Sequence, residues 1–209
     1  MRHQSFVDIA KAGNIDLLFV GDSITDWFYW MRGGNYDLTG KAVWDKTFAP
    51  LKAADFAIAG DTTQGALWRM QNGELDGFKA KLIILMLGTN NVNRNPNAEI
   101  ADGDRLIIEE FKKHQPQAKV LVLGIFPHVM PAGSSYTDGQ LRAPIEEINA
   151  KLATFADNKQ VFYMDIGSKF LAADSTVPAD VMMDGLHPTP KGYQIWADAI
   201  IDRVNALMK

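Results

Sequence analysis

Cysteine is absent from this chain of 209 residues. Its absence excludes disulfide bonds, thiolate zinc sites and a cysteine nucleophile. The chain also lacks an apolar run near the length of about 18 residues that a membrane span needs, and residues 1–12 have none of the features of a signal peptide. We therefore expect a soluble protein without membrane insertion, either cytoplasmic or secreted or periplasmic after removal of a leader.

An excess of positive charge is lacking as well. The chain has 21 basic and 25 acidic residues, and the formal net charge is −4. The charges are spread along the sequence without blocks, which argues against nucleic acid as a partner. With 47% hydrophobic residues, the chain is long enough for one well-buried core and short for two. We expect a single domain over residues 1–209.

Short apolar runs recur along the sequence and alternate with stretches of helical spacing. The runs of strand length lie at residues 16–20, 55–59, 82–87, 120–125 and 161–164, and helical spacing is clearest at 100–111, 141–155 and 193–204. Strands that are apolar on both faces need helices on both sides of the sheet. This pattern predicts an α/β protein with three α/β/α layers, a doubly wound, flavodoxin-like parallel sheet of five strands. Residues 127–139, which contain two Pro and two Gly, are expected to form a long loop near the ligand.

Polar residues follow the apolar runs, at the positions where an open parallel sheet places its ligand. They are Gly21-Asp22-Ser23, Gly60-Asp61-Thr62-Thr63 and Gly88-Thr89-Asn90-Asn91, and, late in the chain, Asp184-Gly185-Leu186-His187. Acyl transfer requires a nucleophile, a base and an orienting carboxylate. Ser23 supplies a hydroxyl, His187 an imidazole that titrates near neutrality, and Asp184 a carboxylate three residues before that imidazole.

Donors for an oxyanion hole are available at the same strand ends. The backbone N–H groups of Ser23 and Gly60 and the side-chain amide of Asn90 could stabilise the charge of a tetrahedral intermediate. Each residue has a plainer interpretation by itself, since Gly60 and Asn90 are common turn residues and Asp184 could cap a loop. Their joint occurrence, each at an expected strand end or in the late loop, favours catalysis.

The quoted motifs, together with Leu67-Trp68-Arg69 and Gln115-Pro116-Gln117-Ala118-Lys119, resemble the SGNH (GDSL) hydrolases over nearly the whole chain. Within that family the resemblance is to the catalytic subunits of platelet-activating factor acetylhydrolase and their bacterial relatives. It implies a serine esterase without cofactor or metal, whose signature residues are Ser23, Gly60, Asn90 and His187, with Asp184 completing the triad. Two positions depart from the common pattern: Ile24 replaces Leu, and Asn91 stands where many members have Asp.

The substrate is less determined than the mechanism. The chain has little spare length for a lid, so an open site for a small acyl group, above all acetyl, is expected. The leading hypothesis is hydrolysis of an O-acetylated carbohydrate, and the alternatives are a lipid, a lysophospholipid or an aryl ester. Most of the aromatic residues at 27–30 are expected to pack into the core. Candidate substrate-binding side chains are Trp27, Trp68, Phe126 and His128, and Tyr136 could contribute an exposed ring.

Two hypotheses from other classes remain open. A metal-dependent phosphoesterase could use Asp22, Asp61, Asp184 and His187 as ligands or their neighbours. A flavodoxin-like binding module could hold a small molecule at the same loops without reaction. The oligomeric state is also open, with a homodimer among the possibilities.

Overall fold

The computed structural model describes residues 2–31, 34–129 and 138–209. Five strands form one parallel sheet with the order β2-β1-β3-β4-β5 in this part of the chain. The strands are β1 (Leu17–Gly21), β2 (Ala53–Asp55), β3 (Leu82–Met86), β4 (Lys119–Leu123) and β5 (Val161–Met164). The fold is a three-layer α/β/α sandwich, as the alternating pattern predicts.

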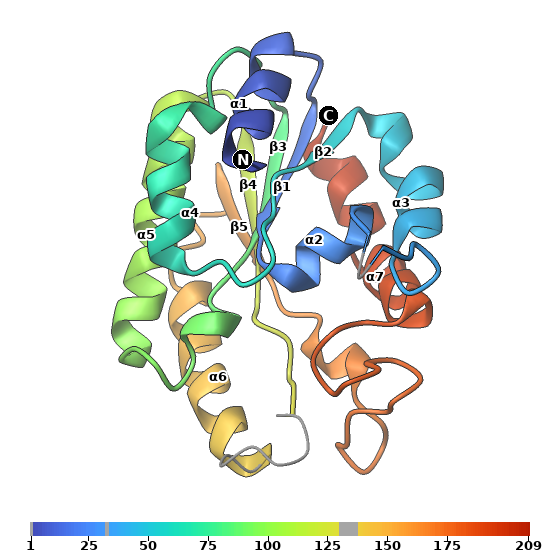
Figure 1. Cartoon of the computed structure of the whole chain (residues 1–209). Coiled ribbons are helices and arrows are strands. Elements are labelled where there is room, and N and C mark those ends of the chain that lie inside the picture. Colours follow the sequence, from blue (N-terminus) through green and yellow to red (C-terminus); the bar gives the residue numbers. More distant parts are fainter. Residues whose placement is uncertain (1, 32–33, 130–137) are drawn as a thin grey trace.

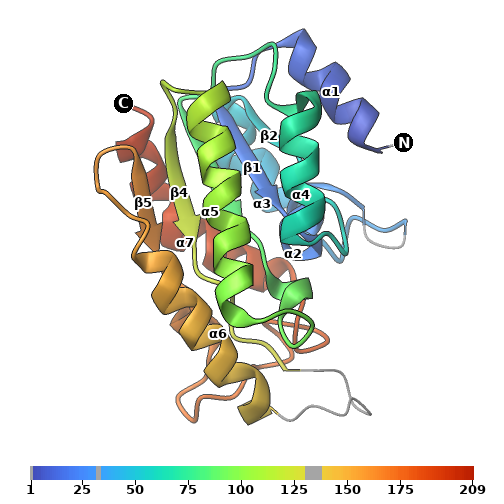
Figure 2. The ribbon, with the colours of Figure 1, turned by 90° about the vertical axis from the view of Figure 1, so that its left-hand side faces the viewer.

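Helices cover both faces of the sheet (Figure 1). One face carries α1 (Arg2–Ala12), α4 (Thr63–Arg69), α5 (Asn97–His114) and α6 (Asp138–Ala153), and the other carries α2 (Ser23–Tyr29), α3 (Lys41–Thr47) and α7 (Pro190–Leu207). Figure 2 looks onto the first of these faces, where α4, α5 and α6 follow one another across the sheet. Short helical turns lie at Ala49–Leu51, Met70–Glu74, Thr89–Asn91 and Gly167–Phe170. None of the described helices is long and apolar enough to cross a membrane.

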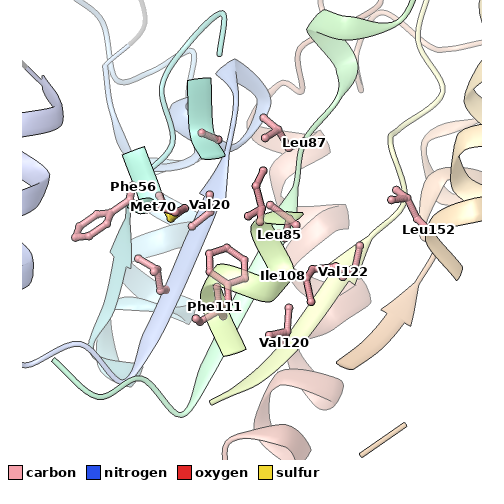
Figure 3. Packing of buried hydrophobic residues seen from close by; sticks show 14 of the residues in the cluster. Val20, Phe56, Met70, Leu85, Leu87, Ile108, Phe111, Val120, Val122 and Leu152 are labelled. Carbon is pink, nitrogen blue, oxygen red and sulfur yellow. The ribbon is translucent and has the colours of Figure 1, made fainter. Parts of the chain in front are cut away.

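The core is divided by the sheet because successive strand residues point to opposite faces. In β1, Leu18 and Val20 belong to the cluster beneath α1, α4, α5 and α6, and Leu17 and Phe19 belong to the cluster beneath α2, α3 and α7. Figure 3 shows the first cluster, in which side chains from β1, β3 and β4 meet Phe111 and Ile108 of α5. All five residues of β1 are buried, which explains why its sequence is apolar without alternation.

The second strand differs from the prediction of residues 55–59, since β2 comprises Ala53–Asp55. Hydrogen bonds to β1 nevertheless continue beyond Asp55, because the N–H of Phe56 donates to the carbonyl of Phe19 at 2.9 Å and the N–H of Ile58 donates to the carbonyl of Gly21 at 3.2 Å. The N–H of Ala57 donates to Asp55 Oδ1 at 2.8 Å, and the N–H of Ala59 donates to Asp26 Oδ2 at 2.9 Å. These two N–H groups lie on the side away from β1, at the edge of the sheet, so the carboxylates satisfy them while the chain continues toward Gly60.

The other elements agree with the sequence pattern to within a few residues at each end, which is the usual uncertainty of such boundaries. The three long amphipathic stretches are α5, α6 and α7. The expected loop at 127–139 is described only at its ends: residues 127–129 have no regular structure, and α6 already begins at Asp138, so the prediction of loop through residue 139 is wrong there.

Candidate active site

The carboxyl ends of β1 and β3 form the switch point of the sheet, because the chain passes from β1 to β2 on one side and then crosses back to β3 on the other side of β1. Ligands of doubly wound sheets bind in the crevice at this point. Ser23 follows β1 directly as the first residue of α2. The Asp22 side chain caps this helix by accepting a hydrogen bond from the N–H of Ile24 at 3.0 Å. Capping by Asp22 thus fixes the turn that presents the Ser23 hydroxyl.

Ser23 forms one hydrogen-bonded chain with Asp184 and His187, two residues that come far later in the sequence. Ser23 Oγ lies 2.9 Å from His187 Nε2, and His187 Nδ1 lies 2.7 Å from Asp184 Oδ2. With Nδ1–H donating to the carboxylate, Nε2 is the acceptor for the serine proton. The order of partners, from hydroxyl to imidazole to carboxylate, is the one that acyl transfer requires.

Asp184 is held ionised by the turn that carries it. Burial by itself raises the pKa of Asp184, but hydrogen bonds from the His187 side chain and from two backbone N–H groups hold this pKa well below its ordinary value. The backbone donors belong to His187, at 2.7 Å, and Leu186, at 3.1 Å. Immediately after this turn, Thr189 caps α7 by accepting from the N–H of Gly192 at 3.2 Å, and Pro190 occupies the first helical position. A capped helix therefore anchors the segment that carries both residues.

Three hydrogen-bond donors remain available beside this chain. The N–H groups of Ser23 and Gly60 have no acceptor among the described residues. Gly60 is exposed, and its φ of +80° is a conformation that residues with a Cβ rarely adopt. The Asn90 side chain donates one N–H to the carbonyl of Asp61 at 2.8 Å, which leaves its second N–H free for another acceptor.

The side chain of Asn91, unlike that of Asn90, is bonded to the start of α4. It is buried, accepts from the N–H of Thr63 at 3.0 Å and donates to Gln64 Oε1 at 2.8 Å. These bonds tie the turn after β3 to the start of α4. Gly88 makes that turn possible, because its φ is +114° and a Cβ would lie 2.9 Å from the side chain of Ile100.

A buried polar network holds the segment of Gly60, and the sequence pattern does not predict it. Arg69 donates to Asp61 Oδ2 at 2.8 Å and also pairs with Glu74. Asp26 accepts from Arg2 of α1 as well as from the N–H of Ala59. The sequence signal is an Asp inside the aromatic helix after Ser23, at a position that proves to be 1% exposed. Such a carboxylate needs partners, and here they are the neighbours of the oxyanion donor.

Two of the candidate substrate-binding residues lie beside the triad. The half-buried Trp27 packs against His187 with ring centroids 4.2 Å apart. His128 is 6% exposed, and its Nδ1 lies 3.0 Å from the carbonyl of Phe126. Burial chiefly lowers the pKa of His128, and the proximity of His187 lowers it further, so its ring is neutral near pH 7.

The structure does not bring the other aromatic candidates to the site. Phe126 is fully buried between Phe170 and Trp196, with ring centroids 4.3 and 5.0 Å away, so the prediction that it binds substrate is wrong. Trp68 is 55% exposed but packs beside His3 of α1, with ring centroids 5.0 Å apart. It lies a turn and a half into α4, away from the strand ends. Tyr136 lies outside the described residues.

Two carboxyl groups outside the triad, those of Asp22 and Asp104, are buried close to Ser23 and to each other. Asp22 is fully buried, and burial raises its pKa from 3.8 to about 7 despite the hydrogen bond from Ile24. Asp104 of α5 is 1% exposed, and neither of its oxygens has a hydrogen-bond partner among the described residues. Burial first and the nearby Asp22 second raise the pKa of Asp104 well above its usual value. Both groups favour the neutral form in the folded protein.

This pair predicts a pH-dependent stability. Between pH 4 and pH 7 the folded chain holds protons that the unfolded chain has released, so the free energy of unfolding should fall as pH rises through this range. The shift of Asp22 corresponds to roughly 4 kcal/mol at most. The substitution Asp104→Asn should make the stability less dependent on pH and raise it at pH 8, because it removes one ionisable group and a like charge beside Asp22. Urea unfolding at pH 5 and pH 8 measures both effects.

Asp102→Asn is the matched control for that experiment, since Asp102 lies on the solvent face of the same helix and pairs with Arg105. It should leave the pH dependence unchanged. The lowered pKa of buried His128 makes the free energy of unfolding rise with pH near the ordinary pKa of histidine. This contribution is the same in both variants. If the stability of Asp104→Asn depended on pH as strongly as that of the wild type, Asp104 would not be protonated in the folded protein.

The metal hypothesis gains no geometric support from the described residues. Among them, no group of three or more His, Asp or Glu side chains is placed to hold a metal ion. Asp184 and His187, two of the candidate ligands, are hydrogen-bonded to each other.

Comparisons with known proteins find relatives in sequence and in fold. The α2 subunit of rat platelet-activating factor acetylhydrolase IB is 34% identical over 197 residues, which cover 92% of this chain and 77% of the relative. A GDSL-like lipase from Bacteroides thetaiotaomicron superimposes with a TM-score of 0.75 at 16% identity, over 98% of this chain and 97% of the other. Est24, a carbohydrate acetylesterase from Sinorhizobium meliloti, superimposes with a TM-score of 0.67 at 20% identity, over 92% and 99%.

The family itself is recognised from the sequence. Residues 19–195 match the GDSL-like Lipase/Acylhydrolase family, and this range extends from β1 into α7. The chain therefore belongs to the GDSL-like lipases and acylhydrolases and is a carboxylic ester hydrolase.

Proposed function

We propose that the protein hydrolyses acetyl esters through a covalent acetyl-enzyme formed on Ser23. The observation that carries this proposal is the chain of hydrogen bonds from Ser23 Oγ to His187 Nε2, at 2.9 Å, and from His187 Nδ1 to Asp184 Oδ2, at 2.7 Å. A serine hydroxyl is a weak nucleophile until a base takes its proton, and here an oriented imidazole lies within reach.

The proposed reaction has two halves. Ser23 Oγ bonds to the acyl carbon as its proton moves to His187 Nε2, and the bond to the alcohol oxygen then breaks as His187 returns that proton to the leaving alcohol. Water next attacks the acetyl-enzyme and gives a proton to His187, which passes it to Ser23 as acetate leaves. Asp184 remains ionised throughout and stabilises the imidazolium. The low pKa of Asp184 supports this role.

The oxyanion of each tetrahedral intermediate is assigned to three donors. They are the N–H groups of Ser23 and Gly60 and the second N–H of Asn90. Charge on this oxygen exists only while the carbon is tetrahedral, so these donors lower the barrier more than they strengthen substrate binding.

For the substrate we propose an O-acetylated carbohydrate. Two findings support it. The α2 subunit of rat platelet-activating factor acetylhydrolase IB is named for removing an acetyl group, and Est24 shows that this fold can carry a carbohydrate acetylesterase. The alternative is an acetylated lipid, which the same rat relative favours through its name.

Covalent labelling tests the nucleophile. A fluorophosphonate should add one label to the wild type, and the label should map to the peptide that contains Ser23. EDTA should leave the hydrolysis of p-nitrophenyl acetate unchanged. Labelling elsewhere, or activity that is lost in EDTA and restored by a divalent metal, would instead support the phosphoesterase hypothesis.

The acyl chain length gives a separate prediction. The compact chain has little room for a lid or a deep apolar tunnel, so a long acyl chain would stay partly in water and add little binding energy in the transition state. We expect kcat/KM to be higher for p-nitrophenyl acetate than for the octanoate. The measurement is kcat/KM for p-nitrophenyl esters from two to twelve carbons. A maximum at eight carbons or more would move the substrate to lipids and leave the triad unaffected.

A further inference from the structure

A pocket of about 330 Å³ lies beside the site, at the carboxyl ends of β4 and β5. Its wall includes His128 after β4, Asp165 after β5, and Arg142 and Glu146 from α6. This volume is at the lower end of the range of about 300–1,000 Å³ that is common for small-molecule sites. The pocket therefore has room for one small ligand group.

The segment after β4 connects the pocket to the catalytic turn, since Pro127 and His128 line the pocket. The backbone N–H of Val129 donates to the carbonyl of Gly185 at 2.9 Å, so the segment after β4 is bonded to the turn between Asp184 and His187. His128 is close enough to His187 to be affected by its charge. In ester hydrolysis the leaving alcohol takes a proton from the imidazole, so it lies on the side of His187. The alcohol part of a substrate is therefore expected near the segment after β4.

His128 provides a hydrogen-bond acceptor, although the residue as a whole is only 6% exposed. It lines the pocket, and its Nδ1–H donates to the carbonyl of Phe126 at 3.0 Å. In a neutral imidazole the other nitrogen carries a lone pair. This nitrogen, Nε2, has no partner among the described residues. A donor from a ligand or from water can pair with this acceptor.

The charged groups of the pocket select the kind of ligand. The lining has two carboxylates, Glu146 and Asp165, and one guanidinium, Arg142. Arg142 donates to the carbonyl of Ser175 at 2.7 Å, and Asp165 Oδ1 accepts from the N–H of Gly167 at 2.8 Å, which leaves Asp165 Oδ2 and Glu146 as acceptors. Acceptors thus outnumber free donors, and the excess of negative charge disfavours an anionic group. No Phe, Tyr or Trp belongs to the described lining, so the pocket lacks the aromatic faces that bind quaternary ammonium groups.

We propose that this pocket binds the alcohol part of the ester, and that this part is a neutral polyhydroxylated group such as a sugar ring. The inference rests on the proposed function and adds the residues that recognise its substrate. Hydroxyl donors reach His128 Nε2, Glu146 and Asp165, and the remaining donors of Arg142 reach a ring or hydroxyl oxygen. Each direct bond to a charged group discriminates a sugar from an alcohol part that has no hydroxyl besides the esterified one.

The experiment compares two neighbouring residues of α6. Glu146→Gln removes a pocket charge, and Glu147→Gln is its matched control, since Glu147 is exposed and bonds to Asn97 instead. The substrates are an acetylated methyl xylopyranoside, p-nitrophenyl acetate and a phosphocholine lipid with an acetyl ester. We expect Glu146→Gln to lower kcat/KM for the xyloside about tenfold or more, mainly through KM, and to change p-nitrophenyl acetate less than twofold. Glu147→Gln should change neither.

Three outcomes would overturn the inference while leaving the esterase intact. They are an equal loss for the xyloside and p-nitrophenyl acetate in Glu146→Gln, no loss for either ester, or a loss confined to the phosphocholine lipid. If the wild type cleaves none of the esters, the proposed function fails, and a binding measurement then tests whether the pocket holds a sugar. Saturation-transfer NMR with methyl xylopyranoside should show binding to the wild type that weakens in Glu146→Gln but not in Glu147→Gln. No signal with the wild type, or equal signals for the wild type and Glu146→Gln, would show that the pocket is not a sugar site.

Discussion

Replacing Ser23 with alanine should reduce the hydrolysis of p-nitrophenyl acetate by about 10⁴-fold or more and leave the fold intact. The substitution removes the hydroxyl oxygen that lies 2.9 Å from Nε2 of the base His187. It leaves the helix cap in place, because the capping carboxylate belongs to Asp22. The measurements are kcat with this ester and the thermal unfolding temperature. The fluorophosphonate label should be lost in the same variant.

His187→Ala should have a similar effect, and the double variant should be little slower than either single one. Nucleophile and base act in the same step, so their losses do not add. His114→Ala is a matched control, because His114 lies at the end of α5 and pairs with Asp76. It should retain full activity. A double variant far slower than both single variants would show that Ser23 and His187 do not share one step.

The sequence predicts the sheet because its strands are buried on both faces and so appear as continuous apolar runs. The carboxyl ends of parallel strands meet at one edge, so the sequence alone groups Ser23 with Asn90, each a few residues after a strand. Asp184 and His187 are paired in the same way, because three residues in a tight turn allow both side chains to meet. In both cases residues that are close in sequence, or that directly follow a strand, are enough to predict where the side chains meet.

The failures have a different origin. Phe126 follows a strand just as the site residues do, and only the packing of Phe170 and Trp196 around it shows that it belongs to the core. The segment between β2 and Gly60 is held in part by Asp26, whose position far earlier in the chain gives no sign that it accepts the N–H of Ala59. Contacts between residues distant in sequence decide these points, and a single sequence does not reveal them.

Asn90→Ala should lower kcat by about 10²–10³ with little change in KM, because it removes a donor to charge that exists only in the tetrahedral intermediate. One N–H of Asn90 is occupied by the carbonyl of Asp61 at 2.8 Å, and this bond aims the amide and leaves the other N–H for the oxyanion. Asn90→Asp should be at least as slow, since it replaces the donor with a negative charge. The measurement is kcat and KM for p-nitrophenyl acetate.

Asn91→Ala is the matched control, because the adjacent amide is buried and bonds to Thr63, Gln64 and Asn95. Its loss leaves the buried N–H of Thr63 without an acceptor and should lower the free energy of unfolding by about 1–3 kcal/mol. Activity should fall far less than in Asn90→Ala, because Asn91 acts on the fold rather than on the intermediate. If both variants instead lost the same factor in kcat with the same loss of stability, Asn90 would be a turn residue and the oxyanion would depend on the N–H groups of Ser23 and Gly60 alone.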